Sequence, residues 1–280
     1  MSEPIKVTVR HLGETRVDVA NITPPKRKPL NPLAAAGVFR PVRDQRYIPC
    51  TTYIIEHPKG IIVIDTGFDK RVRSHPVLEL TAIHNQINKP IQGEGQAVDE
   101  VLASMGIQPS DIKYLFLSHL HSDHANGARQ LIGAEHIVCS KDELDGASKE
   151  DLVTKATFLP RWRRGLNLET FAFADTGLGP VGKSYDLFGD GTVQLVKLPG
   201  HTAGMFGTLI RNNGRQLLLG ADCGYTRAAY QECIVPFFAN DKDGFRKSLN
   251  WEKEIYDQPE TLDVLVNHDI AVLDNTQFVL

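Results

Sequence analysis

The sequence of 280 residues is poor in cysteine and has no long apolar run. Its 4 cysteines are scattered without a C-x-x-C pair, which argues against a disulfide framework and favours a reducing compartment. No stretch approaches the roughly 20 apolar residues of a membrane span, and the first residues lack an apolar leader. We therefore expect a cytoplasmic protein that has no membrane partner.

An excess of charge of one sign is also missing. The formal net charge is -3, and acidic and basic residues are interspersed, so no electrostatic argument favours nucleic acid or a membrane surface. The chain is long enough to bury a large core. We expect one domain over residues 1–280, with irregular insertions near 21–48 and 151–182, and leave open whether it forms a homodimer.

Alternating and periodic patterns predict a mixed α/β chain. Residues 5–20 are expected to form a hairpin that turns at Gly13-Glu14, and residues 21–48, with five prolines, a long surface excursion. Further hairpins are expected at 50–65 and 206–220, strands at 114–117, 193–198 and 264–266, and a helix at 94–105. Another helix is expected to contain Phe245, Leu249, Trp251, Ile255 and Tyr256.

Ligand-type side chains are concentrated directly after the apolar run 114–117. His119, His121, Asp123 and His124 lie within six residues. In an extended segment, side chains two residues apart point the same way, so several of these groups converge. Packing gives no reason for three histidines at this spacing. The stretch therefore predicts a site for Zn²⁺ or another borderline divalent metal.

A histidine or an aspartate follows the end of each predicted apolar strand. If the strands lie side by side, their ends form one rim with enough ligands for two metal ions. These strand-ending residues are Asp65, His119, His201, Asp222 and His268.

On these residues the sequence resembles the metallo-β-lactamase superfamily. The motif His119-Leu-His121-Ser-Asp123-His124, then Pro199-Gly200-His201, Asp222 and His268, follow the order of that family. The resemblance implies a layered α/β fold, an αββα sandwich, with a dinuclear metal site at one edge. It also implies that two metals, Zn²⁺ or else Fe, Co, Mn or Ni, are cofactors.

The resemblance further implies a role for each site residue. His119, His121 and His201 would hold one metal, Asp123, His124 and His268 the other, and Asp222 would bridge them. Asp65 would orient ligands by hydrogen bonding from outside the ligand set.

Among the subgroups, the sequence is most similar to the N-acyl-homoserine lactonases, the quorum-quenching enzymes. Tyr225 stands three residues after Asp222, where those lactonases carry a tyrosine that contacts the lactone carbonyl. The expected function is therefore metal-dependent opening of a lactone ester. Alternatives are an ester, thioester or phosphodiester hydrolase of the glyoxalase II or RNase Z kind, or a non-catalytic binding subunit.

The mechanism that we expect is attack on the ester carbonyl by a hydroxide shared between the metals. Tyr225 would donate a hydrogen bond to the developing oxyanion, and Asp123 would carry a proton to the leaving alkoxide. In the segment 151–182, Phe158, Leu159 and Trp162 are candidates to contact an acyl tail, with core packing or a dimer contact as the alternatives.

Overall fold

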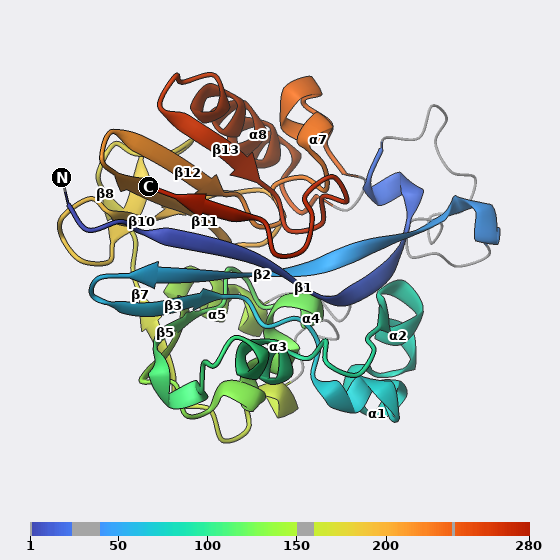
Figure 1. Cartoon of the computed structure of the whole chain (residues 1–280). Coiled ribbons are helices and arrows are strands. Elements are labelled where there is room, and N and C mark those ends of the chain that lie inside the picture. The colour runs from blue at the N-terminus through green and yellow to red at the C-terminus, as the bar shows by residue number, and fades with distance from the viewer. Residues whose placement is uncertain (1, 24–39, 150–159, 237–238) are drawn as a thin grey trace.

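The computed structural model describes residues 2–23, 40–149, 160–236 and 239–280. Two β-sheets lie face to face, with helices on both outer sides (Figure 1). In hydrogen-bonded order, the first sheet contains β14 (Gln277–Val279), β1 (Lys6–Asp18), β2 (Gln45–His57), β3 (Gly60–Ile64), β5 (Ile112–Phe116), β6 (His136–Ser140) and β7 (Leu168–Phe171), and β4 (Lys89–Ile91) also pairs with β1. The second contains β13 (Thr261–Leu265), β12 (Arg215–Leu219), β11 (Phe206–Asn212), β10 (Val193–Lys197), β9 (Lys183–Asp186) and β8 (Ala174–Asp175).

Helices cover both sheets, which confirms the predicted αββα sandwich. α7 and α8 lie above the second sheet in Figure 1, and the earlier helices lie below the first. The helices are α1 (Pro76–Leu80), α2 (Ala82–Ile87), α3 (Val98–Ser104), α4 (Ser122–Ala125), α5 (Lys141–Lys149), α7 (Arg227–Glu232) and α8 (Lys242–Tyr256). Short 3₁₀ turns lie at Val19–Asn21, Val42–Asp44, Lys70–Arg73, Pro109–Asp111, Asn126–Leu131 and Pro160–Arg163.

Three clusters of buried apolar side chains hold the four layers together. One packs the early helices on the first sheet, one fills the space between the sheets, and one packs α7 and α8 on the second sheet. Between the sheets, the rings of Phe116 and Phe206 meet edge to face with centroids 6.2 Å apart. Because each sheet is apolar on both faces, its strands read as nearly continuous apolar runs.

Strand direction brings the ends of the key strands to one edge of the sandwich. β3 and β5 are parallel neighbours in the first sheet, and β12 and β13 are parallel neighbours in the second. β10 and β12 both run antiparallel to β11, so they point the same way. The loops that leave the carboxyl ends of β3, β5, β10, β12 and β13 are those that carry the predicted ligands.

The predicted N-terminal hairpin was wrong, because residues 6–18 form one strand. Both halves of β1 pair with β2, with His11 opposite Thr51 and Glu14 opposite Pro49. Two residues of β1 therefore face one of β2, which defines a β-bulge. Gly13 lies there at φ +91°, and a Cβ on it would be 2.5 Å from the carbonyl oxygen of Ile91. The glycine thus marks a bulge rather than a turn.

The two long segments predicted to be irregular are partly regular. Within 21–48, β2 already begins at Gln45, and within 151–182 the structure has β7 and β8. The remainder of both segments includes 24–39 and 150–159, which lie outside the described residues. Their status as insertions in a single domain stays a prediction. No helix of the described chain is long and apolar enough to cross a membrane.

Helix α8 carries a carboxyl group into the core. Glu252 is fully buried, and burial raises its pKa well above the usual value, an effect that the nearby Cys223 thiol only partly offsets. The other titratable groups that it influences are Tyr53 and Tyr230, whose own pKa values are raised, chiefly by burial. A phenol is neutral or negative at any pH, so neither tyrosine supplies a positive charge that would compensate an ionised Glu252.

We expect Glu252→Gln to be more stable than the parent at alkaline pH. A folded-state pKa above the unfolded one gives stability that is present at low pH and is lost as pH rises through the folded pKa. The glutamine variant lacks this loss, so its advantage should grow with pH and exceed about 1 kcal/mol by pH 8. Urea unfolding of chelated protein from pH 5 to 9 measures it. The exposed Glu254→Gln is the control, and parallel pH curves for Glu252→Gln and the parent would contradict the expectation.

Candidate metal centre

Seven histidine and aspartate side chains converge at the shared edge of the two sheets. The loop after β5 and the short helix α4 bring four of them, and the loops after β10, β12 and β13 bring one each. The sequence-predicted residues that the structure brings together are His119, His121, Asp123, His124, His201, Asp222 and His268.

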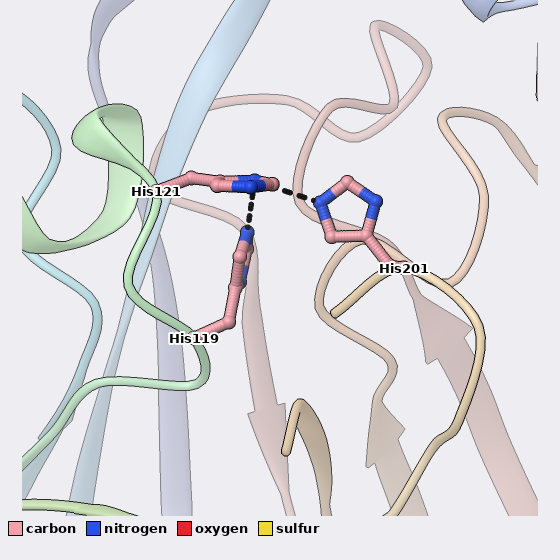
Figure 2. Close-up of side chains that lie close together, drawn as sticks. All are labelled: His119, His121 and His201. Carbon is pink, nitrogen blue, oxygen red and sulfur yellow. Dashed lines mark hydrogen bonds between the residues drawn. The ribbon is translucent and has the colours of Figure 1, made fainter. Parts of the chain in front are cut away.

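Three histidines form the first cluster. Figure 2 shows the imidazoles of His119 and His121, from the loop after β5, turned toward His201 from the loop after β10. His121 Nδ1 lies 3.1 Å from His119 Nε2 and 3.0 Å from His201 Nε2. Burial lowers the pKa of all three, that of His121 to about 3. They are therefore neutral, with ring lone pairs available as ligands.

The second cluster consists of Asp123, His124 and His268, all buried. Oδ2 of Asp123 lies 3.9 Å from His124 Nε2 and 3.6 Å from His268 Nε2. The other ring nitrogens are held from behind. Nδ1 of His124 donates to Asp65 Oδ2 at 2.8 Å, and Nδ1 of His268 donates to the carbonyl of Pro49 at 2.7 Å. These bonds fix the tautomer that leaves each Nε2 facing the cluster.

Asp222 lies between the clusters and presents one oxygen to each. Its Oδ1 is 3.1 Å from His124 Nε2 and 3.2 Å from His268 Nε2. Its Oδ2 is 3.4 Å from His201 Nε2 and 4.0 Å from His119 Nε2. A single carboxylate in this position can serve as a ligand to two ions at once.

The charges of the second cluster favour a cation. Burial acts against the charge on Asp222, but His268 and His124 outweigh it and hold the pKa of Asp222 well below its usual value. Burial likewise acts against charge on His124 and His268, yet the carboxylates around them, Asp222 foremost, raise the pKa of both. A divalent ion can provide the positive charge that protons on these rings would otherwise supply.

The polar atoms that face the centre fit a divalent metal. Within the described chain, Nε2 of His124, Nε2 of His268 and Oδ1 of Asp222 are buried, and none of the three has a hydrogen-bond partner outside this group. Buried polar groups are otherwise nearly always bonded, so orphans that converge on one point need an explanation. The centre contains three groups of three residues, and within each group the ligand atoms lie within 4.8 Å of one another. Imidazole nitrogen with carboxylate oxygen is a donor set for Zn²⁺ and its neighbours.

The comparison with protein families decides the identity of this arrangement. The family model described as the metallo-beta-lactamase superfamily matches residues 46–228, which span β2 to the start of α7. The chain belongs to the metallo-β-lactamase superfamily. The family resemblance predicted from the sequence is thus confirmed, and so is the fold that it implies.

Two relatives of this superfamily member are named for the same activity. It is 30% identical over 230 residues to the N-acyl homoserine lactonase AttM of Agrobacterium fabrum, covering 79% of this chain and 82% of that protein. It is 26% identical over 225 residues to the N-acyl homoserine lactonase AiiA of Bacillus thuringiensis subsp. kurstaki, covering 80% and 82%.

Two solved structures share the fold of this chain. An N-acyl homoserine lactone hydrolase with N-hexanoyl-L-homoserine at its metal centre superposes with a TM-score of 0.72 at 22% identity, covering 95% of this chain and 94% of that one. The dizinc quorum-quenching lactonase AidC, in complex with a product, has a TM-score of 0.66 at 17% identity, covering 95% and 88%. At these identities the likeness concerns the fold.

Asp65 lies behind the ligands of this superfamily member, where the sequence placed it. The residue directly after β3 is fully buried at φ +64°. Its Oδ1 accepts from the backbone N–H of Ser118 at 2.7 Å, and its Oδ2 accepts from the Ser118 hydroxyl at 2.7 Å. Oδ2 also accepts from His124 and, at 2.9 Å, from the side-chain amide of Asn267. Asp65 therefore joins the loops after β3, β5 and β13.

Tyr225 lies beside the centre. Its ring stacks on the imidazole of His268, with centroids 5.3 Å apart and planes 23° from parallel. Burial, then the charges of Asp222 and Asp123, raise the pKa of the Tyr225 phenol well above its usual value. The phenol therefore keeps its proton and remains a hydrogen-bond donor at neutral pH.

Of the three predicted acyl-tail contacts, Trp162 is the one that the described residues include. Phe158 and Leu159 lie outside the described residues. Trp162 is 1% exposed and packs in the core between the early helices and the first sheet. Its indole N–H donates to the carbonyl of Glu79 at 3.0 Å, and its ring meets His84 edge to face. This is the core packing that the sequence left as an alternative.

Sequence reasoning missed the residues that hold Asp65 and the ligands in place. Ser118, Asn267 and the carbonyl of Pro49 make direct contacts to Asp65, His124 or His268. Ser118 and Asn267 each immediately precede a ligand histidine, and that adjacency was the available signal. Nothing in the sequence marks Pro49, whose role depends on how β2 passes the loop after β13.

Proposed function

We propose that this metallo-β-lactamase superfamily member hydrolyses the lactone ring of N-acyl homoserine lactones with two divalent metal ions, Zn²⁺ first among them. The observation that carries the proposal is the position of Asp222, which presents one oxygen to each ligand cluster. The names of the relatives supply the substrate class.

The residues of the centre divide into those that would hold the metal ions and those that would act on the substrate. His119, His121 and His201 would hold one ion, and Asp123, His124 and His268 the other, with Asp222 shared. Two divalent ions held by these residues would lower the pKa of a shared water and would act as a Lewis acid for the carbonyl.

Tyr225 and Asp123 are the residues proposed to act on the substrate. The protonated Tyr225 hydroxyl would donate to the carbonyl oxygen as it gains negative charge. Burial opposes ionisation of Asp123, but His124 and His268 outweigh it and lower its pKa, so its carboxylate is able to accept a proton. Asp123 would pass that proton to the leaving alkoxide.

The test is a lactone-opening assay with a pH indicator. Short- and long-chain N-acyl homoserine lactones are offered to metal-loaded and to chelated protein, with a thioester and a phosphodiester in parallel. We expect metal-dependent opening with kcat/KM above roughly 10⁴ M⁻¹s⁻¹. Turnover of the thioester or phosphodiester without lactone opening would reject the proposal while leaving the fold and the metal site intact.

We expect Tyr225→Phe to lower kcat on lactones about 10²-fold, with metal content unchanged. The variant keeps the ring that stacks on His268 and removes only the donor aimed at the oxyanion, the kind of group whose loss costs roughly 10²–10³-fold. Steady-state kinetics and metal analysis measure both quantities. Tyr230→Phe is the control, since that hydroxyl donates to the carbonyl of Val264 in the core. Full activity of Tyr225→Phe on every lactone would remove its role.

The cellular setting is proposed on less direct grounds. All four cysteines are free, as expected for a reducing compartment such as the cytoplasm. A homodimer stays a prediction, which sedimentation analysis of the purified protein would measure.

A further inference from the structure

Glu143 is a buried carboxylate close to the metal centre that belongs to neither ligand cluster. It lies in the first turn of α5 and is 4% exposed. Its Oε1 accepts from the backbone N–H of Leu120 at 3.0 Å. Its Oε2 accepts from the hydroxyl of Thr202 at 2.7 Å and from the backbone N–H of Gly204 at 2.9 Å. Three donors thus converge on one side chain.

These three bonds connect two loops that belong to different sheets. Leu120 lies between His119 and His121 in the loop after β5, a strand of the first sheet. Thr202 follows His201 in the loop after β10, a strand of the second sheet. The ligands of the first cluster therefore come from both sheets, and Glu143 hydrogen-bonds residues adjacent to them on each side.

The start of α5 is packed against the second loop without room for a side chain. The Ser140 hydroxyl donates to the carbonyl of Gly204 at 2.7 Å and accepts from the backbone N–H of Glu143 at 3.0 Å. A Cβ on Gly204 would lie 2.0 Å from the backbone nitrogen of Glu143. Glycine at this position is what allows the Glu143 carboxylate to reach both loops.

We propose that Glu143 is a positioning residue for the first metal, which sets the separation between His201 and the pair His119 and His121. This role rests on the metal-dependent function proposed above, and it concerns the metal affinity of the three-histidine site alone. Groups that orient ligands from behind typically change metal affinity by roughly 10–100-fold when lost.

The test is a cobalt titration of Glu143→Gln against a competing chelator, followed by the visible absorption of bound Co²⁺. Glutamine has the size of glutamate but only one accepting oxygen, so its NH₂ must face either Leu120 N–H or the Thr202 and Gly204 donors. We expect the three-histidine site to bind Co²⁺ roughly 10–100-fold more weakly. The second site should change less than about threefold. A His201→Ala reference identifies which absorption step belongs to the three-histidine site.

Two further variants keep the test decisive. Asp142→Asn removes the same charge one residue earlier in α5, where Asp142 pairs with Lys197 rather than with either loop, and should leave both affinities unchanged. Thr202→Val removes only one donor and should weaken the same site by a smaller factor, so it carries the test if Glu143→Gln does not fold. Equal weakening of both sites, or no weakening in either variant, would overturn the proposal. Lactones are not used, so failure of the lactonase assignment leaves the result interpretable.

Discussion

Replacing Asp222 by asparagine should reduce lactone opening on the order of 10³-fold and remove at least one bound metal. The parent carboxylate offers Oδ1 to His124 and His268 and Oδ2 to the three-histidine cluster. Asparagine keeps the shape but has one oxygen, and its NH₂ would point at one of the two ions. Since loss of a group that only orients ligands already costs roughly 10–100-fold in metal affinity, loss of a shared ligand should cost more.

Steady-state kinetics and metal analysis of the purified Asp222→Asn variant measure this effect. Asp263→Asn is a suitable control, because it removes a carboxylate from the same sheet whose partner is Arg227 rather than a metal ligand. Circular dichroism shows whether both variants keep the fold. If Asp222→Asn kept two metals and activity within tenfold of the parent, the shared-ligand role would be wrong.

The second large effect is expected on stability, from Asp65→Ala. The fully buried carboxylate accepts four hydrogen bonds, from Ser118, His124 and Asn267, and the substitution removes all four. Breaking one buried charged pair typically costs about 3–5 kcal/mol in the free energy of unfolding. Alanine at φ +64° adds strain, since among residues with a Cβ it is aspartate and asparagine that tolerate this region, through local hydrogen bonds that alanine lacks. We therefore expect a loss of at least about 3 kcal/mol.

Urea unfolding in the presence of chelator isolates the protein's part of this effect from the contribution of bound metal. Asp65→Asn should lose less, because asparagine tolerates positive φ and keeps one accepting oxygen. The control is Asp274→Ala, an exposed acceptor for Arg10 and His11 whose loss should cost less than about 1 kcal/mol. Equal losses for Asp65→Ala and Asp274→Ala would show that the buried contacts add nothing.

The sequence was most informative where strands end. An apolar run followed at once by a histidine or aspartate is visible without a structure, and parallel neighbouring strands bring such ends to one edge, as Asp222 and His268 show. The seven cluster residues were therefore all identified in advance. The fold followed from the family resemblance that these residues carry.

The sequence was least informative where a contact joins distant segments. Gly13 has the local signature of a turn, and only the pairing of both halves of β1 with β2 shows that it is a bulge. Trp162 stands in an irregular stretch whose pattern left an acyl-tail contact, core packing and a dimer contact open, and the fold shows that it is buried against the early helices. Glu143 follows a strand like many surface residues, and its bonds to two loops depend on how the sheets stack.

The spacing of the ligands along the chain has a thermodynamic consequence. Four of the seven lie between His119 and His124, close together in any conformation of the chain, whereas His201, Asp222 and His268 join them only in the folded protein. The unfolded chain therefore keeps a fragment of the site and retains some affinity for metal. Because ligand binding stabilises a fold only by the difference in affinity between folded and unfolded states, metal will protect this protein from denaturation less than its native affinity alone implies.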